Sequence, residues 1–249
     1  MIGTITLEFL FKFFLVFARF AALVIFLPGL GDERVLVRFK LLFAVFFSFI
    51  VIPMVEASLP SFSTSSSTLL FYLASESLIG LMLGLCIRIY YTSFLIVGNL
   101  ISMESGLSAA SMFDPGQKEQ VMIFSSFLML LSLISIFSTD THHIFISGFI
   151  ESYSKFQPGF MLDLGDLADR MSRVAGDSFL LAFKISSPFL IVGVAILVGS
   201  GVLSRLMPTL QVLFVITPVQ ILVMFAVLFI VCGNIIELVI QNIISIFHL

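Results

Sequence analysis

Histidine, cysteine and acidic side chains could support catalysis or bind a metal ion, and few of them occur in this chain. Its histidines are His142, His143 and His248, all at the ends of apolar runs. Adjacent histidines project about 100° apart on a helix, unlike the i, i+4 pair typical of a zinc site. Cys86 and Cys232 lie far apart in apolar segments, which argues against a disulfide framework or a paired metal motif. We therefore expect no catalytic, cofactor or metal site, and we interpret the paired histidines as a polar cluster at a helix end.

The composition indicates an integral membrane protein. Apolar residues make up 59% of the chain and charged residues only 11%, whereas a soluble domain carries about 25% charged residues. The net charge of -3 and the lack of a large basic cluster argue against a nucleic-acid partner.

The apolar residues form about six long runs, which predict an all-α, membrane-type fold of helical hairpins. Residues 41–55 would make a helix of only about 22 Å, against a hydrocarbon core of about 30 Å. The next run, 69–101, would reach about 50 Å. One helix too short beside one too long suggests that they are fitted to each other inside an assembly. Gly80 and Gly84 predict a close helix approach in the long run.

Polar residues form seams along otherwise apolar runs. Glu8, Lys12 and Arg19 share one face of the first run, with Glu8 and Lys12 spaced for an ion pair. A charge at membrane depth costs at least about 2.5 kcal/mol, so the seam should face a partner helix or a water-filled space. The alternative is that these charges snorkel to the membrane surface. The residues that we expect at contacts between subunits are Glu8, Lys12, Arg19, Arg205, Gln211, Gln220, Asn234, Glu237 and Gln241.

Residues 102–120 form a small-residue, partly charged break between two apolar runs, which we interpret as a loop. Irregular backbone at membrane depth survives only where protein or water satisfies its polar groups. The break is therefore a candidate plug of a pore, and the alternative is an ordinary polar connection at a membrane surface. The candidate plug residues are Met103, Gly106, Ser108, Ala109, Ala110, Met112, Phe113, Asp114, Pro115 and Gly116.

Several short motifs resemble one family. They are Ala18-Arg19, Pro28-Gly29, Asp114-Pro115 with Gln120, His142-His143, and the cluster Gly201, Arg205, Met207-Pro208, Gln211-Val212 and Pro218-Val219-Gln220. This pattern resembles the FliR/SctT family of type III export gate subunits over most of the chain. Thr209, Ile216-Thr217 and Thr139-Asp140-Thr141 depart from the family pattern.

The resemblance implies a non-enzymatic subunit of a helical export gate in the bacterial inner membrane, within the flagellar basal body. It implies FliP and FliQ as partners, an FlhB-type subunit nearby, and a conduit for unfolded export substrates. By the same resemblance, residues 1–160 would be a FliP-like part that contains the plug loop (102–120). Residues 161–177 would be an amphipathic linker, and 178–249 a FliQ-like C-terminal hairpin.

Three alternatives remain beside the flagellar gate subunit. The first is the injectisome counterpart SctT, which the sequence does not separate from the flagellar protein. The second is a small-molecule or ion transporter with a discontinuous helix at 102–120, which should show related halves; no internal repeat is visible. The third is an intramembrane enzyme, which would need a nucleophile with a base or clustered metal ligands within the spans.

Overall fold

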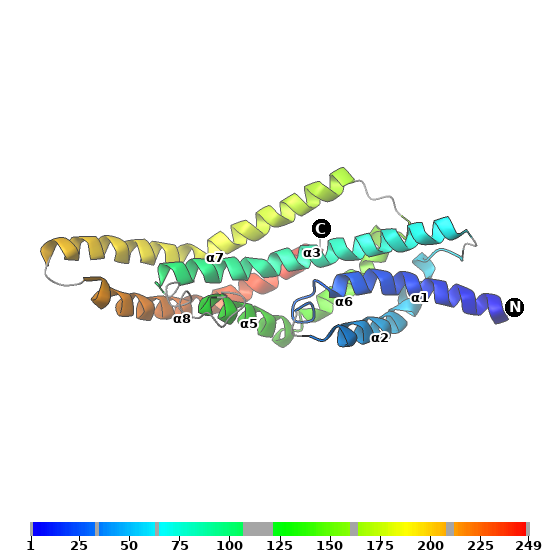
Figure 1. The fold of residues 1–249 in the computed structure, drawn as a ribbon, viewed down its shortest axis with the longest axis horizontal. Helices are drawn as coiled ribbons and strands as arrows, with labels where there is room; N and C mark the ends of the chain where they lie inside the picture. Colours follow the sequence, from blue (N-terminus) through cyan, green and yellow to red (C-terminus); the bar gives the residue numbers. More distant parts are fainter. Residues whose placement is uncertain are drawn as a thin grey trace. The chain divides into compact units, whose positions relative to one another are not determined.

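The chain is all-α. A computed structural model describes residues 2–32, 35–62, 65–106, 122–159, 164–207 and 212–247, and these residues contain helices, turns and no strand. In chain order, with the helices labelled as in Figure 1, the elements are α1 (Ile2–Val24), α2 (Val37–Val55), the 3-10 helix η1 (Glu56–Ser58), α3 (Ser66–Glu104), α5 (Ile123–Ser138), α6 (His142–Lys155), α7 (Leu164–Leu206) and α8 (Val212–Phe247). The predicted all-α class is confirmed.

Four helical segments are long and apolar enough to cross a membrane: residues 37–58, 66–104, 165–206 and 215–238. Helices α5 and α6 add a fifth candidate if the two count as one broken span. Helix α3 has 39 residues and α7 has 43, so they are about 58 Å and about 64 Å long, well beyond a bilayer core of about 30 Å. The membrane-type fold and the expected excess length are therefore confirmed.

One sequence expectation about a helix boundary is wrong. Helix α2 begins at Val37 and has 19 residues, or about 28 Å, so it is not short; Arg38 and Lys40 extend it at its N-terminal end. Residues 164–206 form one continuous helix, so the segment expected as an amphipathic linker is helical from Leu164 and runs on without a break into the next apolar run; its role as a linker between two parts stays a prediction. Pro218 lies inside α8, as proline can in membrane helices, where neighbouring groups satisfy the freed carbonyl.

Helix α6 was not expected from the sequence. It buries Phe145, Gly148, Phe149, Ser152 and Tyr153, whose spacing of three and four residues places them on one helical face. This period-3.6 pattern was the available signal for the helix. The polar residues between these positions obscured it, because they interrupt any long apolar run.

The chain divides into two compact units. Unit 1 comprises residues 1–89, 140–174 and 243–249. Within it, α1 lies beside α2 (Figure 1), and Phe20 on α1 stacks on Phe47 with ring centroids 4.0 Å apart. Phe149 of α6 packs edge-on against Phe20 at 5.1 Å. Aromatic packing among α1, α2 and α6 is therefore part of the core of this unit, together with buried aliphatic side chains such as Leu15 and Val51.

Helix α3 reaches α1 through glycines. A Cβ atom at Gly80 would collide with the carbonyl oxygen of Arg19, and one at Gly84 would press on Leu23 and Phe26. The predicted close approach at Gly80 and Gly84 is therefore confirmed. At Gly199 on α7, in contrast, an added Cβ atom would meet open space among the described residues.

Unit 2 comprises residues 90–139 and 175–242. Its α3 segment meets α5 where Gly98 lies against the backbone of Ser125. The Ser125 hydroxyl donates to Asn99 Oδ1 at 2.7 Å, and Phe124 packs against Phe225 of α8 at 5.0 Å. The predicted likeness of 1–160 and 178–249 to two partner subunits stays a prediction.

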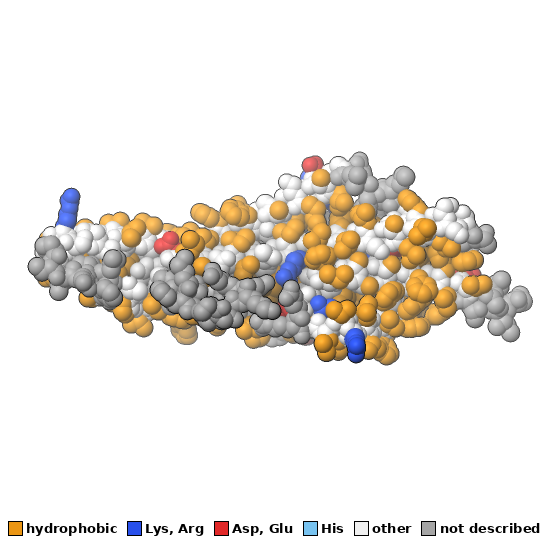
Figure 2. Space-filling model, in the orientation of Figure 1, with side chains coloured by type: hydrophobic (Ala, Val, Ile, Leu, Met, Phe, Trp, Pro, Cys, Tyr) orange, Lys and Arg blue, Asp and Glu red, His pale blue; other side chains and the backbone are white. Residues whose placement is uncertain are grey.

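Large apolar side chains remain exposed along the helices, and few charged ones accompany them on the face drawn in Figure 2. On α8, Phe229 and Ile230 are 85% and 77% exposed, and on α7 Leu197 is 70% exposed. A water-soluble protein rarely exposes so continuous an apolar surface. These helices are therefore suited to lipid or to apolar surfaces of other proteins.

Candidate functional site

Arg19 lies at the centre of the most elaborate polar contact in unit 1. Its side chain projects from α1 and is fully buried, as is that of Glu76 on α3. Arg19 Nε donates to Glu76 Oε2 at 2.6 Å, and Nη2 donates to Oε1 at 2.8 Å. This bidentate geometry, with two parallel hydrogen bonds, is the strongest form of the arginine–carboxylate pair.

Helix α6 and the residue that follows it accept further hydrogen bonds from the Arg19 guanidinium group. Arg19 Nη1 donates to the Ser152 hydroxyl at 3.0 Å, and Nη2 donates to the carbonyl oxygen of Phe156 at 2.9 Å. The guanidinium carbon lies 3.8 Å from the centre of the Tyr153 ring, within cation–π range. We call Arg19, Glu76, Ser152 and Tyr153 the buried arginine cluster. It connects α1, α3 and α6, so it fixes three helices at one point.

The buried arginine cluster changes the interpretation of the first polar seam. The sequence assigned Arg19 to a contact between subunits, but its side chain makes its polar contacts inside this chain. The expectation that the seam faces a partner helix is met by α3 and α6. Sequence reasoning did not pair Arg19 with Glu76 because 57 positions separate them. A contact of Arg19 with another subunit stays a prediction.

The other two residues of this seam lie near the surface. Lys12 Nζ is 3.4 Å from Glu8 Oε1, which confirms the predicted i, i+4 pair, and 3.0 Å from Glu56 Oε1 in η1. The hydrogen bond to Glu56 raises the pKa of Lys12 above its usual value. Because the Glu8 and Glu56 side chains are 45% and 61% exposed, water weakens both attractions.

The candidate plug is described only at its start. Helix α3 continues through Glu104, so Met103 is helical, which corrects the boundary of the predicted loop; its side chain is 63% exposed. Gly106 follows in a turn with φ of +75°, a conformation that glycine adopts without strain. The remaining candidate plug residues, Ser108 to Gly116, lie outside the described residues.

Unit 2 holds the start of the break in place. Gln220 of α8 donates a hydrogen bond from Nε2 to the backbone carbonyl of Glu104. The Glu104 side chain lies against Gly193 of α7 so closely that a Cβ atom there would overlap its carboxylate. Three helices therefore meet at Glu104, and Gln220 contacts α3 within this chain. Its predicted contact with another subunit stays a prediction.

The polar residues of the C-terminal seam face outward. Arg205 at the end of α7 is exposed, as are Asn234, Glu237 and Gln241 on α8. Their steps of three and four residues keep the last three on one helical face. Gln211 lies outside the described residues. Among the expected contact residues that the structure describes, Arg205 and the α8 set are exposed and so available to another molecule.

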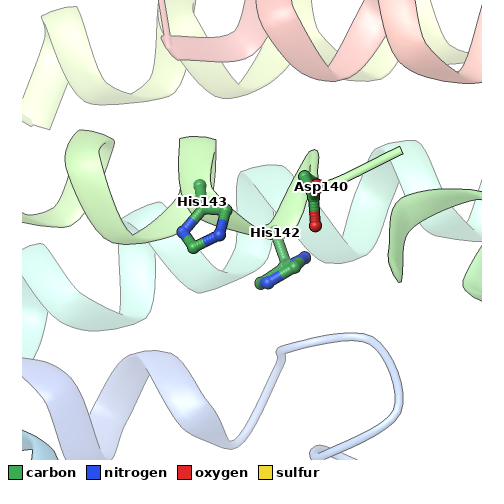
Figure 3. A group of neighbouring side chains, drawn as sticks. All are labelled: Asp140, His142 and His143. Carbon is green, nitrogen blue, oxygen red and sulfur yellow. The ribbon is translucent and has the colours of Figure 1, made fainter. Parts of the chain in front are cut away.

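One set of possible metal ligands occurs among the described residues. Asp140 lies in the turn after α5, and His142 and His143 begin α6, so the histidines start a helix rather than end one. Figure 3 shows the three side chains around this turn. One ligand atom from each lies within 4.8 Å of the other two. The sequence argument against a metal site assumed that adjacent histidines diverge, but their ring centroids are 4.3 Å apart.

Long apolar helices, a buried ion pair and an outward-facing polar seam define an all-α protein of membrane type. The chain belongs to family 1 of the bacterial export proteins, whose model matches residues 10–245. It is 31% identical over 208 residues to the flagellar biosynthetic protein FliR of Caulobacter vibrioides, covering 84% of this chain and 83% of that protein. It is also 28% identical to FliR of Bacillus subtilis, over 94% of this chain and 90% of that protein. FliR of Aquifex aeolicus is 26% identical, over 86% and 82%.

Proposed function

We propose that this chain is a subunit of the flagellar type III protein export gate in the bacterial inner membrane, within the flagellar basal body. With FliP and FliQ, and beside an FlhB-type subunit, it forms the conduit through which unfolded flagellar proteins leave the cell. The relatives named above, all called flagellar biosynthetic protein FliR, support the flagellar system over the injectisome. In this role the chain transports protein and performs no enzymatic reaction.

The observation that carries the proposal is the polar seam on α8. Asn234, Glu237 and Gln241 are exposed on a helix whose other exposed residues are strongly apolar, such as Phe229 and Ile230. A carboxylate or amide facing lipid is costly, so these groups need a polar partner or a water-filled space. Neighbouring subunits around an aqueous conduit would supply both.

The helix lengths also support an assembly that is not confined to the bilayer. Helices α3 and α7 exceed the hydrocarbon core by about 28 Å and about 34 Å. Tilting absorbs only part of such an excess. A gate whose subunits surround one another would cover the remainder with protein.

The break at 102–120 is proposed as the plug of this conduit. A pore wide enough for an unfolded polypeptide leaks ions unless apolar side chains exclude water from it. Met103, Met112 and Phe113 supply flexible or bulky apolar groups, and the small residues between them allow close backbone packing. The contacts of Glu104 with Gln220 and Gly193 support the idea that the plug starts from a fixed point.

Co-purification tests the proposal directly. The tagged chain should be recovered as one monodisperse complex when it is co-expressed with FliP and FliQ, and should aggregate when expressed alone, because its α8 seam then lacks partners. Cells that lack the gene should fail to secrete flagellar filament protein, and the cloned gene should restore secretion. A well-behaved monomer in detergent, together with normal flagellar secretion in the deletion strain, would refute the proposal.

A further inference from the structure

The turn between α5 and α6 carries three side chains that could share one metal ion. We propose that Asp140, His142 and His143 bind a divalent transition-metal ion, with Zn²⁺ as the probe, through one carboxylate oxygen and two imidazole nitrogens. The candidate ligand atoms lie within 4.8 Å of one another. The export function proposed above is argued without a metal ion, so the inference goes beyond it.

The spacing of the ligand atoms is close to what zinc requires. Zinc binds nitrogen and oxygen ligands at about 2.0–2.2 Å in a tetrahedron, which places neighbouring ligand atoms about 3.3 Å apart. Closing the present separation of at most 4.8 Å therefore needs a movement of about 1.5 Å. Rotation about the side-chain bonds of Asp140 and His143 supplies such a movement, because both side chains are exposed.

The local backbone explains how consecutive residues converge. Asp140 has φ of +55°, a left-handed conformation that aspartate adopts more readily than most residues. The chain therefore turns sharply at Asp140 and α6 begins at His142. The imidazole rings of His142 and His143 lie with centroids 4.3 Å apart and planes tilted by 32°. The carboxylate and the two rings thus belong to one four-residue segment of unit 1.

The donor set selects the class of ion. Imidazole nitrogen favours zinc, copper, iron and nickel over magnesium and calcium, and one carboxylate oxygen completes a common zinc ligand set. Three protein ligands leave one tetrahedral position for water or for a group of another subunit. A bound ion would tie the turn at Asp140 to the first turn of α6, and so would stabilise the start of the helix that carries Ser152 and Tyr153.

The test uses the full chain, purified in detergent from membranes with any subunits that accompany it, through an affinity tag that contains no histidine. After treatment with a chelator, Zn²⁺ is added, and bound zinc is measured by mass spectrometry and by competition with a zinc indicator dye. The variants are Asp140→Asn, which keeps a residue suited to the left-handed turn, and His143→Ala. His248→Ala is the matched control, because it removes the one histidine outside the cluster.

The wild-type chain should bind one Zn²⁺. Removing a residue that only hydrogen-bonds to a metal ligand already lowers metal affinity about 10–100-fold. Removing a ligand itself should cost at least as much, so Asp140→Asn and His143→Ala should each weaken zinc binding at least about tenfold. His248→Ala should bind as the wild type does, and circular dichroism should show unchanged helix content in every variant. Co²⁺ substituted for zinc should give visible bands without the near-ultraviolet thiolate band that Cys86 or Cys232 would produce.

Three results would overturn the site: no stoichiometric zinc on the wild-type chain, equal affinity in the wild type and in an Asp140→Asn/His143→Ala double variant, or a cobalt–thiolate band. Each result concerns binding and is obtained without measuring export. Failure of the metal site would therefore leave the proposed export function untouched, and failure of co-purification would not affect the zinc measurement.

Discussion

Replacing Arg19 with leucine should severely destabilise the chain. Arg19→Leu removes two hydrogen bonds to Glu76, at 2.6 and 2.8 Å, and one to Ser152 at 3.0 Å, while Glu76 remains fully buried. Removing one partner of a buried ion pair leaves a carboxylate without its counter-charge and costs about 3–5 kcal/mol. A folded domain is stable by only about 5–15 kcal/mol in total. The loss should therefore appear as poor folding and assembly rather than as altered conductance.

The double variant Arg19→Leu/Glu76→Leu separates loss of a charge pair from loss of shape. Apolar replacement of both members of a buried ion pair is often neutral or even stabilising, so the second substitution should restore most of what the first removes. Lys12→Leu on the same helix is the matched control. Its partners Glu8 and Glu56 are largely exposed, so its cost should stay below about 1 kcal/mol.

The assay is the steady-state amount and protease resistance of each variant in membranes, followed by thermal unfolding of the purified complex in detergent. Arg19→Leu should be scarce and protease-sensitive, whereas Lys12→Leu and the double variant should resemble the wild type. The reasoning fails if Arg19→Leu is as stable as Lys12→Leu. It also fails if the double variant is no better than the single one, because the buried charge would then not be the cause.

Three further substitutions or deletions test other parts of the structure. Glu237→Leu should reduce recovery of the complex with FliP and FliQ, while the exposed acidic control Glu151→Leu should not; normal recovery with lost export would contradict the seam on α8. Deleting residues 106–112 should raise ion or dye leakage across the inner membrane while export persists in part. If the deleted form assembles and leaks no more than the wild type, the plug assignment is wrong. Gly80→Val should lower the free energy of unfolding by about 1–3 kcal/mol, because the new side chain would force α3 away from the Arg19 carbonyl. Gly199→Val is the control: open space surrounds Gly199, so the free energy of unfolding should stay nearly unchanged in the same measurement.

Local chemistry was sufficient for several sequence predictions. The ion pair between Glu8 and Lys12 lies within one helical turn, so its geometry follows from the period of the helix alone. The close approach at Gly80 and Gly84 follows from the absence of side chains on one helical face. The apolar composition and the long runs determined the membrane-type, all-α class, because lipid leaves helices as the simplest way to pair every backbone group.

Helix boundaries were less predictable. Apolar runs indicated where lipid or other protein could surround the chain, but helices α2 and α7 continue into charged and acidic segments that such runs do not include. Helix α6 was missed for the same reason, because its buried residues are only one face of a largely polar segment. A hydropathy pattern records burial in an apolar medium, whereas backbone hydrogen bonding can carry a helix beyond it.

Only the tertiary structure decided which polar groups meet. Arg19 and Glu76 are 57 positions apart, and nothing in their local sequence distinguishes that pairing from a contact with another subunit. Glu104 is likewise bound by Gln220 from a helix 116 positions away. Asp140, His142 and His143 lie with their ligand atoms within 4.8 Å of one another, which the sequence argument from diverging adjacent histidines did not anticipate. The sequence by itself determined that buried charges would need partners, and the packing of the helices determined which partners they have.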